Sequence, residues 1–344
     1  MPETVINARA AARTQLSGVE RWADELARRL PLLRPGAYDV ARPPRALAYR
    51  AGQAWEQAAL PVHARRRGAR LILNPANLAP LGWRGNVVVV HDAVALTHPE
   101  WFSRAYRGWH ARMLPAVVRR ARRVIAVSEF SRAEVAAAVG VDAEVIEVVG
   151  GGVGERFRPD ADVDGARAAL GLDGPYVLTL GGEGARKNVD ALGPAARALA
   201  DRGVALVGAG SRRAHHGEVA GVAGLRALGY VDDALLPGLL AGAAAFVLPS
   251  LHEGFGLPCL EAMACGTPVV AADRAALPET CGDAAVLVDP ARPDDIAEAL
   301  VSIVDDETGA SSLRERGFRR AASFTWERTA EEVDRILSRE GRTL

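Results

Sequence analysis

Two glutamates on either side of a glycine-rich turn are the residues of this sequence best suited to binding a ligand. Glu253 stands directly before the turn, residues 254–258, and Glu261 follows eight positions after Glu253. Glycine lets backbone N–H groups approach a ligand closely, and a helix that begins behind such a turn attracts an anion such as phosphate. Because a carboxylate only accepts hydrogen bonds, each glutamate suits the hydroxyl groups of a polyol. Phosphate held between two polyols describes a nucleotide-sugar, with its sugar at Glu253, its diphosphate at the turn and its ribose at Glu261.

The segments around this turn are expected to hold it at the edge of a parallel sheet. The apolar run 244–248 is expected to be a strand, residues 259–264 a helix, and residues 269–272 the next strand. Pro258 suits the first turn of the helix, where its missing N–H has no partner to lose. Strand, glycine turn, helix and strand form a βαβ unit. The alternative is a buried βαβ unit whose glutamates are merely solvated.

A second loop suited to anions covers residues 181–188, which read GGEGARKN after an expected strand at 176–180. Of the 42 basic residues, 41 are Arg, and the single Lys is Lys187 in this loop. Arg and Lys are not interchangeable where a compact point charge meets phosphate. Together with Arg186, Lys187 can hold a diphosphate and stabilise the negative charge that grows on it as a sugar departs.

The first half of the chain offers two further candidate residues. An expected strand at residues 4–7 is followed by a loop and by a helix that starts at Gly18. A glycine at a helix start can face an anion, but it is as often only a cap. A buried strand at 87–90 ends in His91, at the carboxyl end where open α/β sheets place ligand sites. His91 could bind a substrate hydroxyl or phosphate with Asp92 orienting its ring, or it could be a histidine satisfied within the core.

Length and composition indicate a globular protein of two domains. A chain of 344 residues is long for one core, and two domains of about 150 residues each are expected. Apolar residues make up 49% of the sequence, with no apolar run near the ~18 residues of a membrane span. The N-terminus begins polar, so we expect no secretory leader. The three cysteines have no metal-ligand spacing, which favours buried thiols in a reducing cytoplasm.

The net charge is zero, but the charges are unevenly distributed. Residues 1–155 hold 22 Arg against 14 acidic residues, whereas the remainder holds 20 basic and 28 acidic residues. A basic half favours an anionic partner, such as an acidic glycan, lipid phosphate or a membrane surface. An Arg-rich solvated surface accounts for it equally well. No aromatic residues interleave with the arginines at 65–67 and 119–123, so we expect no nucleic-acid partner.

Residues 253–270 resemble the signature of a known family. Their sequence, Glu-Gly-Phe-Gly-Leu-Pro-Cys-Leu-Glu-Ala-Met-Ala-Cys-Gly-Thr-Pro-Val-Val, is similar to the Glu-x7-Glu signature of the family 4 retaining glycosyltransferases. The Arg-Lys-Asn at 186–188 and the His-Asp-x-x-x-Leu-x-x-Pro that begins at His91 look like the mannosyltransferase-like branch. The resemblance implies an α/β protein with the GT-B fold, in which two Rossmann-like domains with parallel sheets face each other across a cleft.

The resemblance also implies that the chain is divided into three parts. Residues 1–155 form a Rossmann-like domain on the acceptor side, and residues 156–322 form the Rossmann-like domain that binds the nucleotide-sugar. Residues 323–344 form a C-terminal helix that crosses back to the first domain.

Roles for individual residues follow from the same resemblance. Lys187, Glu253 and His91 are the implied catalytic residues. Donor binding is assigned to Gly18, Arg186, Val231, Gly254, Phe255, Gly256, Leu257 and Glu261, with Val231 in a segment whose backbone contacts the nucleobase. The family often has a further Arg five residues before Lys187, where this sequence has Gly182. Either Arg186 replaces that Arg, or stabilisation of the leaving group is weaker.

The implied activity is retaining, metal-independent transfer of a sugar from a nucleotide-sugar to a glycan, lipid-linked or natural-product acceptor. Such an enzyme would serve polysaccharide biosynthesis in the cytoplasm or at the inner face of its membrane. GDP-mannose is the favoured donor, and UDP- and dTDP-sugars stay open. No Asp-x-Asp follows an expected strand, so we expect no metal, and no other cofactor is expected.

Two alternative functions stay open at this point. One is a non-catalytic nucleotide-sugar-binding partner subunit, which the Gly at position 182 motivates. The other is a GT-B epimerase or a phosphorylase. A phosphorylase would carry pyridoxal phosphate on a lysine, and the only lysine, Lys187, lies in a phosphate loop.

Overall fold

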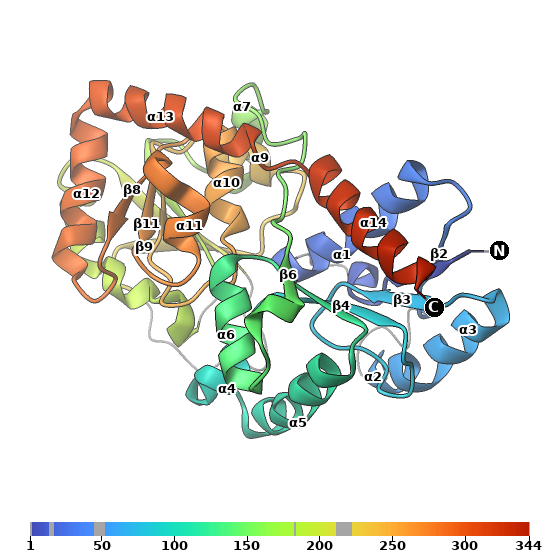
Figure 1. The fold of residues 1–344 in the computed structure, drawn as a ribbon. Helices are drawn as coiled ribbons and strands as arrows, with labels where there is room; N and C mark the ends of the chain where they lie inside the picture. Colours follow the sequence, from blue (N-terminus) through green and yellow to red (C-terminus); the bar gives the residue numbers. More distant parts are fainter. Residues whose placement is uncertain (1, 14–16, 45–51, 182–183, 211–221, 344) are drawn as a thin grey trace. The chain divides into compact units, whose positions relative to one another are not determined.

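The computed structural model describes residues 2–13, 17–44, 52–181, 184–210 and 222–343, and the chain forms two compact units (Figure 1). Unit 1 comprises Met1–Thr97, Ala105–Gly152 and Trp326–Leu344, and unit 2 comprises His98–Arg104 and Val153–Thr325. Each unit is built on a six-stranded parallel sheet with helices, which confirms the predicted α/β fold class.

The sheet of unit 1 has the strand order β2-β1-β3-β4-β5-β6, and every neighbouring pair is parallel. Its central strands are short, fully buried apolar runs, as expected for a parallel sheet covered by helices. The strands are β1 (Thr4–Asn7), β2 (Tyr38–Ala41), β3 (Leu71–Asn74), β4 (Asn86–Val90), β5 (Arg123–Ala126) and β6 (Ile146–Val148). The helices of this unit are α1 (Gly18–Leu33), α2 (Gly52–Ala54), a π-helical turn (Trp55–Ala59), α3 (Leu60–Arg67), α4 (Val94–Thr97), α5 (Arg104–Arg120), α6 (Glu129–Val139) and α14 (Trp326–Arg342).

The sheet of unit 2 has the strand order β12-β11-β10-β7-β8-β9, again with parallel neighbours. Its strands are β7 (Tyr176–Leu180), β8 (Ala205–Ala209), β9 (Leu225–Gly229), β10 (Ala245–Leu248), β11 (Val269–Ala272) and β12 (Ala285–Val288). Its helices are α7 (Val163–Leu170), α8 (Gly193–Ala200), α9 (Leu236–Ala241), α10 (Leu257–Ala264), α11 (Leu277–Cys281), α12 (Pro293–Asp305) and α13 (Glu307–Ala322). Counted in chain order, this is the order of a doubly wound Rossmann sheet, which reverses between β7 and β10.

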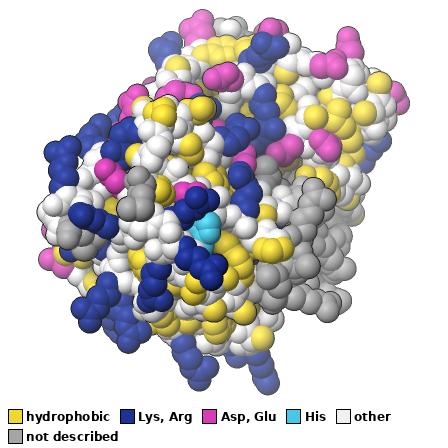
Figure 2. Space-filling model, turned by 90° about the vertical axis from the view of Figure 1, so that its right-hand side faces the viewer, with side chains coloured by type: hydrophobic (Ala, Val, Ile, Leu, Met, Phe, Trp, Pro, Cys, Tyr) yellow, Lys and Arg dark blue, Asp and Glu magenta, His cyan; other side chains and the backbone are white. Residues whose placement is uncertain are grey.

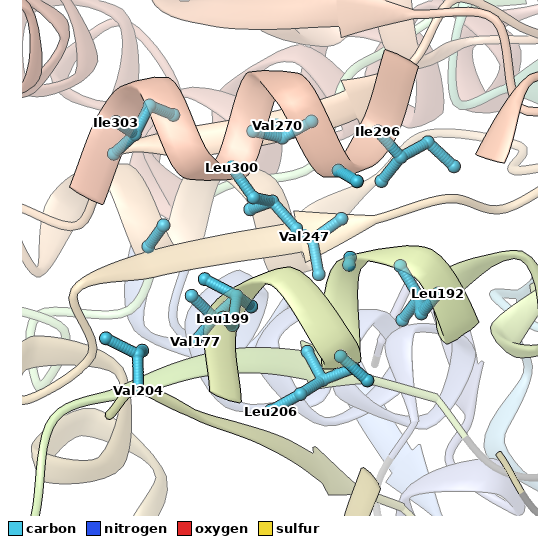
Figure 3. Close-up of a cluster of buried hydrophobic side chains, with 14 of the residues drawn as sticks. Val177, Leu192, Leu199, Val204, Leu206, Val247, Val270, Ile296, Leu300 and Ile303 are labelled. Atoms are coloured by element: carbon cyan, nitrogen blue, oxygen red, sulfur yellow. The ribbon is translucent and has the colours of Figure 1, made fainter. Parts of the chain in front are cut away.

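A cluster of buried aliphatic side chains joins the sheet of unit 2 to α8 and α12 (Figure 3). Val177, Val247 and Val270 come from the neighbouring strands β7, β10 and β11, and all three are fully buried. Leu199 of α8 and Leu300 of α12 belong to the same cluster and are also fully buried. The positions of β7 and β10, and of the segments that follow each strand, therefore depend on this core.

The C-terminal helix α14 is part of unit 1. Its first residue, Trp326, is fully buried, and its ring meets that of Trp22 in α1 edge to face with the ring centroids 5.6 Å apart. The Thr329 hydroxyl donates a hydrogen bond of 2.8 Å to the carbonyl of Gly150. Directly before the helix, Thr325 forms a parallel bridge with Val153, so the chain enters and leaves unit 2 at neighbouring residues.

Two features of the fold differ from what the sequence pattern indicates. His98–Arg104, which the expected division puts in the first domain, clusters with unit 2. The strand β2 lies in the Pro-rich stretch 31–69, which the sequence pattern leaves unassigned apart from an expected helix at 53–66, and it pairs with β1 along its whole length. Among the described ranges, no helix has the length and apolar character needed to traverse a bilayer.

Truncating Leu300 should destabilise unit 2. We expect Leu300→Ala to lower the free energy of unfolding by about 2–5 kcal/mol, because the substitution leaves a cavity under α12. Urea denaturation measures this loss. The exposed Glu298→Ala on the same helix is the control and should change the stability by less than about 0.5 kcal/mol. Equal effects of the two substitutions would contradict the description of this core.

Candidate functional site

The candidate site of unit 2 lies where the strand order of its sheet reverses. The strands β7 and β10 are direct neighbours in the sheet, although β8 and β9 separate them in sequence. Open α/β sheets bind ligands outside the carboxyl ends of the strands at such a reversal. The loop 181–188 follows β7 and the turn 249–256 follows β10, so both predicted anion loops start at this point.

The side chains of Lys187 and Glu253 meet between these two loops. Lys187 Nζ lies 2.6 Å from Glu253 Oε1, and Arg186 Nη1 lies 3.9 Å from Glu253 Oε2. Only 8% of the Glu253 surface is exposed. The aliphatic stem of Lys187 crosses Gly181, where a Cβ atom would lie 3.0 Å from Lys187 Cδ. A glycine at this position therefore leaves the room that the lysine needs to reach Glu253.

The environment of this contact shifts the pKa of both partners. Burial alone would raise the pKa of Glu253, but the charges of Lys187 and Arg186 outweigh it and lower that pKa to about 2. Burial, helped by the neighbouring Arg186, lowers the pKa of Lys187, although Glu253 opposes the shift. The carboxylate is thus ionised at neutral pH and is held by two cations.

Hydrogen bonds between the loops hold this geometry. The Leu251 N–H donates to the Arg186 carbonyl at 2.8 Å. Asn188, which has a left-handed backbone with φ 51°, donates from its amide to the carbonyls of Pro249 and Pro290 at 3.2 and 2.9 Å. Asn tolerates this backbone region better than most residues. Its side chain therefore ties the lysine loop to the segments that follow β10 and β12.

The glycine-rich turn leads directly into α10. Gly256 has φ 105°, and a Cβ atom there would lie 2.7 Å from Leu277 Cδ2, so only glycine fits. It is the N-terminal cap of α10, and Pro258 stands in the first turn as predicted. The helix begins at Leu257, two residues before the predicted start, because the chain turns at Gly256 rather than after Pro258.

The other predicted donor residues of unit 2 are distributed along the same sheet edge. Gly254 and Phe255 lie in the turn and are buried, as is Leu257. Glu261 follows one turn into α10 and is 3% exposed. Val231 is buried and follows the carboxyl end of β9, which β7 and β8 separate from β10. Gly182, the position at which the sequence departs from the family pattern, lies outside the described residues.

His91 lies in unit 1, directly after β4, as predicted. It is 7% exposed, and its ring meets that of Trp22 edge to face at 5.7 Å. Its Nε2 donates to the carbonyl of Pro75 at 2.9 Å. Since a carbonyl only accepts, Nε2 carries the proton and Nδ1 of the neutral ring can accept. Burial lowers the pKa of His91 despite the Pro75 carbonyl and the nearby carboxylate of Asp92, so the ring is neutral at pH 7.

Gly18 is the first residue of α1, also in unit 1. Ser17 caps this helix, and its backbone N–H donates to Glu20 Oε2 at 3.0 Å in a capping box. Glu20 lies close enough to His91 to influence its pKa, so the start of α1 and the end of β4 are near each other.

Two polar arrangements, one in each unit, were not predicted from the sequence. In unit 2, the His98 ring stacks on Trp101 at 4.2 Å and meets the buried His252 ring at 6.0 Å, one residue from Glu253. In unit 1, Arg9 Nε binds the fully buried Glu56 at 2.5 Å. Neither contact has a sequence signal, because each joins residues far apart in the chain.

The arrangement in unit 2 can bind a polyphosphate. Two cations and the start of α10 lie at one sheet edge, where N–H groups and positive charge favour an anion. The ionised Glu253 can accept from hydroxyl groups. Among the described residues, no group of three or more His, Cys, Asp and Glu side chains is placed to hold a metal ion.

Known structures and families agree with this architecture. Sucrose-phosphate synthase from Thermosynechococcus elongatus matches over 100% of both chains, with a TM-score of 0.78 at 20% identity. The fold is therefore the GT-B fold. Residues 36–156 match the model of Glycosyltransferase Family 4, and residues 174–306 match that of Glycosyl transferases group 1. The two matches, one in each half of the chain, support a glycosyltransferase.

Curated relatives match parts of the chain. The O-antigen chain mannosyltransferase B of Escherichia coli is 46% identical over 103 residues, which are 30% of this chain and 27% of that protein. The D-inositol 3-phosphate glycosyltransferase of Rhodococcus opacus (strain B4) is 36% identical over 212 residues, 56% of this chain and 47% of that protein. The matches span less than half the length of either relative.

Removing one partner of the Lys187–Glu253 pair should destabilise unit 2. We expect Glu253→Gln to cost about 1–3 kcal/mol, because it leaves a largely buried ammonium without its carboxylate. Combining it with Lys187→Gln should give a coupling energy of about 0.5–3 kcal/mol in a double-mutant cycle measured by urea unfolding. The exposed pair Arg202–Asp305, tested as Arg202→Gln and Asp305→Asn, is the control and should couple by less than about 1 kcal/mol. Additive losses at Lys187 and Glu253 would show that the contact does not stabilise the fold.

The same ion pair predicts that the free energy of unfolding depends on pH in the acid range. Because the pKa of Glu253 is lowered from 4.5 to about 2, its stabilising effect is complete above pH 4.5 and is lost as the pH falls toward about 2. The difference in unfolding free energy between the wild type and Glu253→Gln should be constant from pH 7 to pH 5 and shrink below that range. Urea titrations at several pH values measure it. A difference independent of pH down to about 2 would contradict the ion pair.

Proposed function

We propose that the protein is a retaining glycosyltransferase that moves a sugar from a nucleotide-sugar donor to an acceptor. The contact between Lys187 and Glu253 at the reversal of the unit 2 sheet carries this proposal. It puts a phosphate-binding cation beside a carboxylate that accepts from sugar hydroxyls, which is the combination a nucleotide-sugar needs.

The proposed donor runs along the Glu-x7-Glu segment. Glu253 holds hydroxyl groups of the sugar, the backbone of Gly254, Phe255, Gly256 and Leu257 faces the diphosphate, and Glu261 holds the ribose. The buried Val231 offers backbone groups to the base. An ammonium has three donors, so Lys187 can bind Glu253 and a phosphate oxygen at once. Gly18, at the start of α1, is proposed to face the donor from unit 1.

The proposed catalysis is stabilisation of the leaving group. As the bond between sugar and diphosphate breaks, negative charge grows on the diphosphate, and Lys187 and Arg186 stabilise it. No metal ion and no other cofactor is part of this proposal, because the two cations supply the charge. His91, whose neutral Nδ1 can accept, steadies the sugar or the incoming acceptor hydroxyl. The sugar would leave and the acceptor attack on one face, which retains the anomeric configuration.

GDP-mannose is the proposed donor. The mannosyltransferase among the relatives supports it, since that protein is 46% identical to this chain over 103 residues. UDP- and dTDP-sugars are the other donors to test. The proposed acceptor is a glycan, a lipid-linked sugar or a natural product, in polysaccharide biosynthesis in the cytoplasm. Because the first half of the chain is rich in arginine, the inner face of the membrane is a further proposed partner.

Two other functions would use the same site. A partner subunit would bind the nucleotide-sugar without turning it over, and an epimerase would convert the sugar without transferring it. The pairing of Lys187 with Glu253 favours transfer over both, because a leaving diphosphate requires a cation beside the sugar.

Calorimetry and product analysis test the proposal. We expect GDP-mannose to bind the wild type more tightly than UDP-glucose or a dTDP-sugar, with no change on adding a chelator. Lys187→Ala should lower kcat by about 10²–10³ while the fold is kept, as for other removed donors to a leaving group. The exposed Arg202→Ala is the control and should leave both binding and turnover unchanged.

Each other result would decide against part of the proposal. Binding of no nucleotide-sugar would contradict the donor site. Binding without release of the nucleoside diphosphate would favour the partner subunit, and an isomerised nucleotide-sugar would favour the epimerase. Normal turnover by Lys187→Ala would remove the assigned role of that residue.

A further inference from the structure

Nine arginines lie in the connections that lead into three neighbouring strands of unit 1. The strands β3, β4 and β5 are parallel, so their amino ends share one edge of the sheet, which we call the basic edge. His91 follows the carboxyl end of β4, so the basic edge lies opposite the candidate site residues of this unit. The arginines are Arg65, Arg66, Arg67 and Arg70 before β3, Arg84 before β4, and Arg119, Arg120, Arg122 and Arg123 before or at the start of β5.

Much of the charge on the basic edge is not neutralised by carboxylates. Arg67 pairs with Asp39, and Arg122 and Arg123 share Glu340. Within the described part of the chain, no carboxylate forms an ion pair with Arg65, Arg66, Arg84 or Arg120. Figure 2 shows one face of the molecule, with several Lys and Arg side chains in its lower part. Unpaired arginines on one surface attract anions.

A cavity opens within the basic edge. Its volume is roughly 460 Å³, and Leu81, Trp83, Arg84 and Arg120 line it. The guanidinium of Arg65 lies over the Trp83 ring, 5.7 Å from its centroid. The indole N–H of Trp83 has no hydrogen-bond acceptor among the residues that the structure describes. The cavity thus combines two exposed guanidinium groups with apolar walls.

We infer that this cavity binds the phosphate head group of an anionic phospholipid and holds unit 1 against a membrane surface. Guanidinium groups bind phosphate through two parallel hydrogen bonds, which suits Arg84 and Arg120. Trp and Leu suit the boundary between head groups and acyl chains, and the indole favours this depth of a bilayer. The two arginines of the cavity thus suit a lipid phosphate, and its apolar walls suit the acyl chains beside that phosphate.

Other anions fit the cavity less well. A free phosphate ion would make no use of the walls that Leu81 and Trp83 provide. A single-stranded nucleic acid would need exposed aromatic faces on which bases can stack, whereas Arg65 covers a face of Trp83.

The inference rests on the part of the proposed function that puts an anionic surface beside the first half of the chain, and it is independent of the donor chemistry. The cavity belongs to unit 1, and the loops around Lys187 belong to unit 2. Binding to vesicles and binding to a nucleotide-sugar are therefore separate measurements. Failure of one would leave the other unaffected.

Vesicle flotation tests the inference. We expect the full chain to float with vesicles of phosphatidylcholine that contain about 30% phosphatidylglycerol, and not with phosphatidylcholine alone. Arg84→Ala combined with Arg120→Ala should weaken this binding about 25-fold, because each arginine near an anionic surface contributes about fivefold. Arg84→Lys with Arg120→Lys should keep much of the binding, since the charge is retained.

A matched control separates the cavity from net charge. Arg197→Ala with Arg319→Ala removes two exposed arginines from α8 and α13 of unit 2, so it makes the same change in net charge. It should bind the vesicles like the wild type. Urea unfolding of the Arg84 and Arg120 variants checks that they are folded.

Several outcomes would overturn the inference. One is equal weakening by both double substitutions, and another is equal binding to vesicles with and without phosphatidylglycerol. A third is binding of inorganic phosphate or glycerol 3-phosphate with no binding to vesicles, which would indicate a soluble phosphate ligand. Binding of an RNA duplex without vesicle binding would assign the basic edge to a nucleic acid.

Discussion

The contact between Lys187 and Glu253 is the interaction around which unit 2 is arranged. Each partner is largely removed from water, so each is tolerable only while the other is present. The pair forms because β7 and β10 lie side by side, and the buried aliphatic core keeps them there. Gly181 leaves room for the lysine stem, and Asn188 ties its loop to the neighbouring connections. The chemistry of the loops is thus a consequence of the strand order.

The local sequence predicted the two loops of this site, but it did not predict that their side chains are in contact. Pro258 and the glycines before it fix a turn and a helix start, because their backbone constraints act over a few residues. The contact between Lys187 and Glu253 spans 66 positions and depends on which strands are neighbours, and no local pattern encodes that. The same limit explains why His98, which lies far from His252 in the chain, was expected in the other domain. Fold class was predictable since buried strands alternate with helices along the whole chain.

The two edges of the unit 1 sheet have different electrostatic characters. At the carboxyl edge, the buried Asn7 amide donates a hydrogen bond of 3.0 Å to Asn74 Oδ1. His91 is neutral there, and the charge of Arg9 is balanced by Glu56. At the amino edge, exposed arginines exceed their carboxylate partners. The two edges of one sheet therefore differ in how far their charges are paired.

The position of α14 makes the order of synthesis matter for folding. Residues Val153–Thr325 form unit 2 as one nearly continuous segment, whereas Trp326 completes the core of unit 1 against Trp22. During synthesis on the ribosome, α14 is made after all of unit 2. The core of unit 1 therefore stays incomplete until unit 2 has been made. During this interval the apolar surface around Trp22 is exposed, and unit 2 can fold first although it is encoded later. The packing of α14 is therefore the step that completes the core of unit 1.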